Sequence, residues 1–152
     1  MLPVCHPTFS LWKGPPVGFS YGGKPILTYN GGPCFAELVI LRLLHGHGWD
    51  GAWVETYGGT HYLRTMPHGW SLQPEHVLIP TDKEKLLQRI RKKVGTSACF
   101  DVFAWRGKQI LFCEFKQAEK DRLNAPQRKF IAGALTCGIP LESLMVVEWK
   151  CV

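Results

Sequence analysis

The chain has 152 residues, of which 45% are hydrophobic and 20% charged, a composition typical of one globular domain with a buried core. The chain is too short for two domains, and its apolar runs are too short to cross a bilayer, so no membrane partner is expected. Residues 1–10 lack the basic and apolar regions of a secretory signal. The six cysteines show no CxxC spacing, which favours reduced, mostly buried thiols in a cytoplasmic protein, or a nuclear one in a eukaryote.

The formal net charge of +6 is unevenly distributed along the chain. Lysines and arginines balance aspartates and glutamates within residues 1–81, so residues 82–152 carry the whole excess. A one-sided basic surplus suits a polyanion such as nucleic acid, because neutralised phosphates release counterions. An ordinary solvated face would show the same surplus, so charge alone leaves both interpretations open.

The first half of the chain predicts one buried helix. Residues 1–32 are rich in Gly, Pro and aromatic residues, and we expect an irregular N-terminal extension or short strands there. Residues 33–45 are expected to form a helix, with Pro33 in its first turn and Gly46 just after its end. Glu37 lies on an apolar surface of this helix, so its carboxylate requires a cation, a metal or a proton.

Residues 52–56 predict a short strand, followed by an insertion at about residues 57–97. Within the insertion, residues 81–94 predict a basic helix for which Thr81 and Glu84 would form a capping box. Several basic residues of this helix would either contact a nucleic-acid backbone or form an ordinary solvated face; these are Arg89, Lys92 and Lys93.

Residues 98–105 and 109–117 predict two strands joined by a tight turn at residues 106–108. A helix capped by Asn124 would run to about Cys137, and a last strand would cover residues 144–149. The fold class expected from this order is α/β, a mixed β-sheet flanked by helices (αβββαβ) with an inserted basic helix.

The two predicted strands place three charged side chains together. Alternate side chains of a strand share a face, so Glu114 and Lys116 lie side by side, and the turn brings Asp101 close to Glu114. Two carboxylates in apolar surroundings repel each other unless a cation neutralises them, and oxygen ligands suit Mg²⁺ or Mn²⁺. Lys116 could then position or deprotonate an attacking water, or stabilise charge on a phosphate. By themselves, however, the three residues fit a structural ion cluster equally well.

From Phe100 onward the chain carries an ordered set of short motifs. They are Phe100-Asp101, Glu114-Phe115-Lys116, Asp121-Arg122-Leu123-Asn124, Gln127 and Gly138-Ile139-Pro140. This set resembles the VRR-NUC branch of the PD-(D/E)xK nuclease superfamily, closely over the last third of the chain and loosely back to residue 33. Phe100 replaces the family's proline before the aspartate, and the loop from Lys116 to Asp121 is one residue longer than the common form.

The resemblance implies a metal site on the predicted hairpin. Asp101 and Glu114 would bind Mg²⁺ or Mn²⁺ together with the backbone carbonyl of Phe115. Glu37 would act through a water or on a second metal. Lys116 would be the catalytic lysine.

The resemblance also implies a function for the whole chain. Gln127 would support the catalytic site, and Lys120 and Arg122 would lie near the scissile strand. Residues 1–152 would form a single nuclease domain, with a restriction-endonuclease-like core at residues 33–152, that hydrolyses DNA rather than RNA. Branched or flapped DNA is one candidate substrate, and a homodimer is one candidate assembly. The alternative is a nucleic-acid-binding module that keeps the fold and has lost cleavage.

The histidines raise a second metal hypothesis. No set of cysteines and histidines has the spacing of a zinc finger or of an HExxH motif, so a zinc site is not expected. His61 or His68 could reach a substrate phosphate, although a surface loop position is the simpler interpretation for both.

Overall fold

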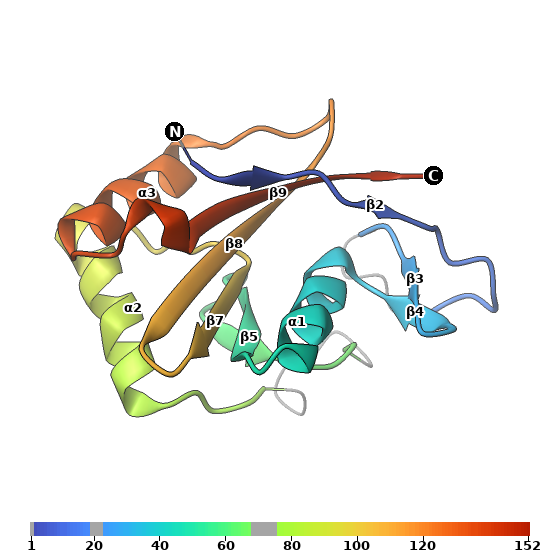
Figure 1. Ribbon diagram of the computed structural model, residues 1–152, viewed down its shortest axis with the longest axis horizontal. Helices are drawn as coiled ribbons and strands as arrows, with labels where there is room; N and C mark the ends of the chain where they lie inside the picture. Colours follow the sequence, from blue (N-terminus) through green and yellow to red (C-terminus); the bar gives the residue numbers. More distant parts are fainter. Residues whose placement is uncertain (1, 19–22, 68–75) are drawn as a thin grey trace.

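The computed structural model describes residues 2–18, 23–67 and 76–152, which form a mixed β-sheet with helices on both faces (Figure 1). Strand order in the sheet is β1-β9-β8-β7-β5-β6, and β2 also pairs with β9. Strand β9 runs parallel to β8, β1 and β2, whereas the other pairs are antiparallel. The strands of this sheet are β1 (Val4–Cys5), β2 (Thr8–Phe9), β5 (Asp50–Glu55), β6 (His61–Leu63), β7 (Val102–Arg106), β8 (Gln109–Gln117) and β9 (Leu144–Cys151).

Three α-helices and a small second sheet complete the described part of the chain. Strands β3 (Leu27–Tyr29) and β4 (Gly32–Cys34) form an antiparallel hairpin. The helices are α1 (Ala36–Gly46), α2 (Thr81–Val94) and α3 (Ala125–Thr136), with a short 3-10 turn at Leu141–Ser143. None of the helices among the described residues is long and apolar enough to cross a membrane.

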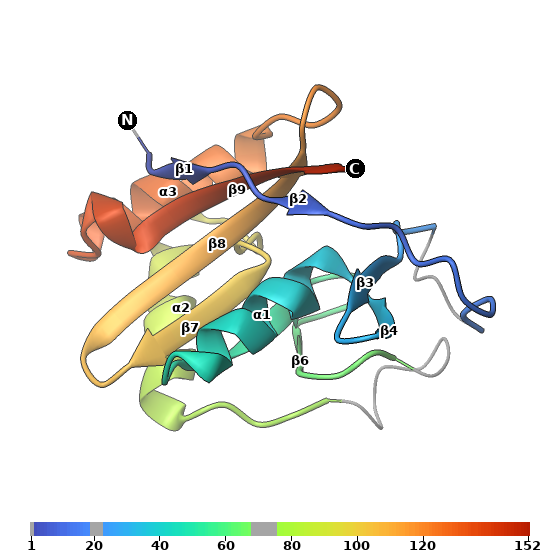
Figure 2. The same ribbon diagram turned by 45° about the vertical axis from the view of Figure 1, so that its right-hand side comes forward.

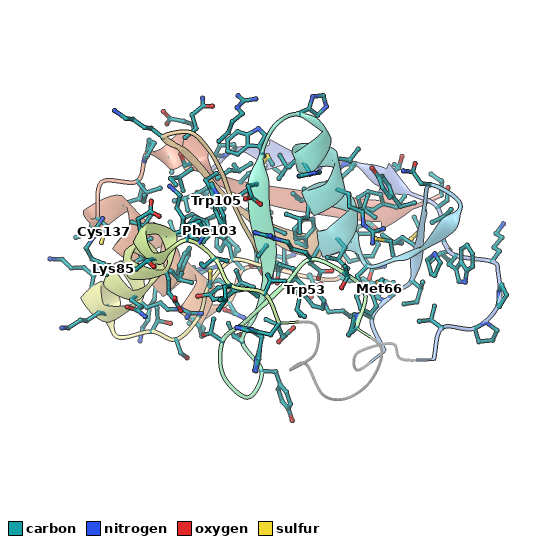
Figure 3. The ribbon with its side chains drawn as sticks, turned by 90° about the horizontal axis from the view of Figure 1, so that it is seen from below. Trp53, Met66, Lys85, Phe103, Trp105 and Cys137 are labelled. Carbon is teal, nitrogen blue, oxygen red and sulfur yellow. The ribbon has the colours of Figure 1, made fainter. Side chains whose placement is uncertain are left out.

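Helix α1 covers one face of the sheet, and α2 and α3 cover the other (Figure 2). The strands alternate accordingly, because successive side chains point to opposite faces. Val102 and Ala104 pack in the core under α1, and Phe103 and Trp105 pack in the core under α2 and α3. Figure 3 shows Phe103 and Trp105 on the side of α2, and Trp53 on the side of α1.

The element order predicted from the sequence is confirmed. The series α1, β5, β7, β8, α3, β9 gives the αβββαβ order, and β6 and α2 are inserted between β5 and β7. The mixed sheet flanked by helices is therefore the expected α/β class. All six cysteines, each within the described residues, are free thiols.

One predicted helix start and one predicted helix cap are wrong, although the bounds predicted for α2 are confirmed. Helix α1 begins at Ala36 rather than at residue 33, because Pro33 pairs with Thr28 in the β3–β4 hairpin. Helix α2 has Pro80 as its N-cap, so Thr81 is already the first helical residue and forms no side-chain cap. The predicted capping box between Thr81 and Glu84 is therefore absent, and the Glu84 amide instead donates to the carbonyl of Pro80 (3.0 Å).

The N-terminal segment contains short strands rather than an irregular extension. Strands β1 and β2 add to the edge of the sheet along β9 (Figure 2). The chain next pairs with the segment around β3: the Trp12 amide donates to the carbonyl of Ile26 (2.9 Å), and the Thr28 amide donates to the carbonyl of Ser10 (2.8 Å). These bonds fix the backbone just before β3, which becomes important for the site described below.

The two helices on the second face approach closely at Gly133. A Cβ atom at Gly133 would lie 2.6 Å from the carbonyl oxygen of Ile90 and 3.0 Å from a methyl group of Val94. The close approach lets Phe130 of α3 reach the fully buried core under the sheet. A side chain at this position would have to push α2 and α3 apart.

We therefore expect Gly133→Ala to lower the free energy of unfolding by about 1–3 kcal/mol, despite the higher helix propensity of alanine. The matched control is Gly46→Ala, since Gly46 is also helical and a Cβ there would meet no atom within 4 Å. The control should be neutral or stabilising by up to about 1 kcal/mol. Urea denaturation of both variants measures the difference. Equal stability of the two would contradict a steric contact at Gly133.

Candidate active site

A cavity of about 350 Å³ opens where the end of β8, the segment before β7, and the first turns of α1 and α3 meet. Figure 2 shows the end of β8 and the starts of β7 and α1 at the same end of the sheet. The structure brings together here all the residues for which the sequence predicted a catalytic or metal-binding role. These residues are Glu37, Asp101, Glu114, Phe115, Lys116 and Gln127.

Asp101 is held by backbone contacts to both neighbouring strands. Its carbonyl accepts a hydrogen bond from the amide of Val54 (2.7 Å). Its amide donates to Oε2 of Glu114 (3.3 Å), and its carboxylate oxygen Oδ2 accepts from the amide of Phe115 (2.9 Å). Because the β7–β8 register pairs Val102 with Cys113, Asp101 and Glu114 come opposite each other at the end of the hairpin, as predicted.

Glu114 is 3% exposed and accepts from two neighbouring side chains. Its Oε1 lies 3.2 Å from Nζ of Lys116, and it also accepts a hydrogen bond from Nε2 of Gln127. Burial raises the pKa of Glu114 to about 7, although Lys116 opposes the shift. Burial, together with the negative charges of Glu114 and Glu37, also raises the pKa of Asp101 well above its usual value.

Gln127 connects this pair of carboxylates to the start of α3. The Asn124 side chain accepts from the amide of Gln127 (2.9 Å), and Oε1 of Gln127 accepts from the amide of Asn124 (2.9 Å). This capping box satisfies backbone donors that the first turn of a helix would otherwise leave unpaired. The amide group of Gln127 is thereby oriented so that its nitrogen donates to Glu114. The sequence predicted the Asn124 cap and a supporting role for Gln127, but not this link between them.

Glu37 enters the cavity from the first turn of α1, where a negative charge interacts favourably with the helix dipole. Its carboxylate is paired with Lys24, which the sequence did not identify: Nζ of Lys24 lies 2.6 Å from Oε1 of Glu37. Burial lowers the pKa of Lys24, but the charge and hydrogen bond of Glu37 outweigh this effect and raise it overall. The buried Glu37 was expected to require a cation, a metal or a proton, and Lys24 supplies the cation.

The donor set of the cavity suits a hard divalent cation. Asp101 and Glu114 are two carboxylates of raised pKa that face each other, and a positive charge between them would relieve their repulsion. Their carboxylate oxygens contact amide and ammonium groups. Among the described residues, no group of three or more His, Cys, Asp or Glu side chains is arranged to hold a metal ion. Metal binding would therefore have to displace some of these contacts.

The residues expected to contact nucleic acid lie outside the cavity. Lys120 and Arg122 are exposed in the loop after β8, on either side of Asp121, which lines the cavity. Three basic residues are exposed on α2 and do not line the cavity; they are Arg89, Lys92 and Lys93.

The histidines contribute nothing to this cavity where the structure describes them. His61 and His76 pack against each other near β6, with ring centroids 5.7 Å apart. His68 lies outside the described residues.

In comparisons with protein-family models, with curated proteins and with solved structures, the chain has no match.

The raised pKa values predict how the stability of the metal-free protein depends on pH. The folded protein keeps protons on Glu114 and Asp101 that the unfolded chain releases above about pH 4.5. The contribution of Glu114 is fully present below that pH and is lost as pH rises through about 7, and the raised pKa of Asp101 acts in the same direction. In EDTA, the free energy of unfolding should therefore fall by roughly 1–3 kcal/mol between about pH 5 and pH 8.

Urea denaturation of the wild type and of Glu114→Gln across this pH range isolates the effect, since the glutamine keeps the hydrogen-bond acceptor and does not titrate. The variant should be more stable than the wild type at the alkaline end, and its stability should depend less on pH. Parallel pH curves for the two proteins would show that Glu114 has an ordinary pKa.

Proposed function

We propose that this protein is a metal-dependent nuclease of the VRR-NUC branch of the PD-(D/E)xK superfamily, with a restriction-endonuclease-like core, and that it hydrolyses phosphodiester bonds in DNA. The observation that carries the proposal is the convergence of Glu37, Asp101, Glu114, Lys116 and Gln127 in one cavity. These residues come from three elements and from the segment before β7, and they are separated by up to 90 positions in the chain. The αβββαβ order of the described core supports the same assignment.

Each residue has a distinct role in this proposal. Asp101 and Glu114 would hold Mg²⁺ or Mn²⁺, together with the backbone carbonyl of Phe115. The bound cation would supply charge stabilisation to the phosphoryl oxygens. Lys116 would stabilise negative charge on the scissile phosphate or take a proton from the attacking water. Gln127 is a positioning residue, because it restrains the carboxylate of Glu114 from α3.

The substrate and assembly follow from the resemblance rather than from the geometry of the cavity. DNA is favoured over RNA, and branched or flapped DNA is included among the proposed substrates. Two copies of the chain would provide the two sites needed to cut both strands of a duplex, so a homodimer belongs to the proposal. Exposed basic residues would contact the phosphate backbone. They are Lys120 and Arg122 beside the cavity, and Arg89, Lys92 and Lys93 on α2.

A second candidate function is a nucleic-acid-binding module without cleavage. The observation in its favour is that Glu37 and Glu114 already have ammonium partners, at 2.6 Å and 3.2 Å. Such pairs let the carboxylates remain buried without any metal. The same module could use the basic exposed residues of α2 to bind nucleic acid.

The two functions are separated by incubating the protein with labelled linear, flapped and four-way DNA in Mn²⁺, Mg²⁺ or EDTA. We expect cleavage with either metal and none in EDTA. Lys116→Ala and Asp101→Ala should each lower the cleavage rate by about 100-fold or more, the size of effect found when a charge-stabilising group is removed from an active site. Lys108→Ala is the matched control, because Lys108 is exposed in the β7–β8 turn at the opposite end of the hairpin.

Fluorescence anisotropy with the same DNAs completes the assay. Binding without metal-dependent cleavage would favour the inert module. Cleavage that persists in both Lys116→Ala and Asp101→Ala would show that the chemistry occurs elsewhere. If the protein neither binds nor cleaves nucleic acid, the cavity is a structural ion cluster.

A further inference from the structure

Lys24 is a second lysine of the cavity, and it comes from outside the region that resembles the nuclease family. It lies in the segment before β3, and its side chain is 31% exposed beside a Glu37 side chain that is 7% exposed. Its ammonium is held by a direct contact of 2.6 Å to Oε1 of Glu37. The carboxylates of Asp101 and Glu55 also interact electrostatically with this ammonium.

Several contacts hold Lys24 in place. Nζ lies 5.7 Å from the ring centroid of Trp53, a cation–π distance, and Trp53 is 1% exposed. Pro25, the next residue, also lines the cavity and restricts the backbone of Lys24. The carbonyl of Ile26 is bonded to the amide of Trp12 (2.9 Å). Lys24 is therefore a fixed cation of the cavity and not a lysine that swings freely in solvent.

We propose that Lys24 takes the place of a second divalent cation, so that the site binds one metal ion per chain, at Asp101 and Glu114. Glu37 is then the counter-ion of Lys24 rather than a metal ligand. This inference rests on the metal-dependent function proposed above and deepens it.

Two physical arguments support a single ion. An ammonium in hydrogen-bond contact with Oε1 of Glu37 occupies the space that Mg²⁺ or Mn²⁺, bound at about 2.1 Å from a carboxylate oxygen, would need. Charge balance gives the same result. When all of them are ionised, as metal binding requires, the cavity's four carboxylates oppose the ammonium groups of Lys24 and Lys116, which leaves two net negative charges; the carboxylates are Glu37, Asp101, Glu114 and Asp121. One divalent cation balances that charge, whereas a second would leave an excess of two positive charges in the cavity.

The test is the number of Mn²⁺ ions bound per chain, measured by isothermal titration calorimetry and checked by equilibrium dialysis. The wild type should bind about one ion, and Lys24→Met about two, because the variant leaves the Glu37 carboxylate available to a metal. Methionine keeps most of the length of the lysine side chain. Lys24→Arg keeps the positive charge and should bind about one ion, like the wild type.

A double variant locates the second ion and controls for misfolding. In Lys24→Met/Glu37→Gln the buried charge and its partner are both removed, so the cavity should be stable and the stoichiometry should return to about one. Lys24→Met alone leaves Glu37 without its cation. Its melting temperature in EDTA should therefore fall below that of the double variant, and Mn²⁺ should raise it more than it raises that of the wild type.

Each outcome separates this inference from the proposed function. If the wild type and Lys24→Met both bind one ion, Lys24 does not replace a metal, but the site at Asp101 and Glu114 stands. A wild type that binds two ions also overturns the role of Lys24. A wild type that binds no Mn²⁺ overturns both proposals. If one ion binds and DNA is not cleaved, only the nuclease function fails.

Discussion

The register of the β7–β8 hairpin is the constraint on which the rest of the site depends. It places Asp101 opposite Glu114, and the two residues then exchange contacts between backbone amides and carboxylates. A shift of one strand by one residue would send its side chains to the other face and separate the two carboxylates, because side chains alternate along a strand. The hydrophobic pattern prevents that shift, since Phe103 and Phe112 stack under α3 with ring centroids 4.4 Å apart. The apolar core thus determines where two like charges meet.

The other elements of the site supply hydrogen-bond donors and positive charges that reduce the repulsion between the carboxylates. Helix α3 contributes the amide of Gln127, oriented by its own capping box, and β8 contributes the ammonium of Lys116. On the other side, α1 adds a third carboxylate at Glu37, and the N-terminal segment neutralises it with Lys24. The compensation is incomplete, because the pKa values of Asp101 and Glu114 remain raised. Buried carboxylates of raised pKa that line a cavity are candidates for a functional site, and structural ion pairs can show the same shifts.

The sequence predicted the parts of the molecule that local periodicity determines. The alternation of side chains along the predicted strand placed Glu114 and Lys116 on one face. The predicted turn at Gly107 placed Asp101 opposite Glu114, so the residues alone predicted that these side chains lie together. Lys24 could not be predicted in this way, because it lies in a Gly- and Pro-rich segment without periodicity and is placed by long-range pairing of residues 10–12 with residues 26–28. The only signal was indirect: a glutamate on an apolar helix surface requires a partner, but the sequence does not say which cation supplies it.

The charges of the cavity and of the surface have opposite signs, and this contrast bears on how a polyanion could approach. The basic surplus of residues 82–152 includes exposed lysines on α2 and α3, among them Lys93 and Lys129, whereas the cavity is lined by carboxylates. Surface lysines would attract a phosphate backbone, but Asp101 and Glu114 would repel a phosphate that entered the cavity. In the proposed function, a cation bound between these two carboxylates would remove that barrier, and the ammonium of Lys24 would lower it beforehand without a second metal. Metal binding and phosphate binding would then be coupled through the same local charge.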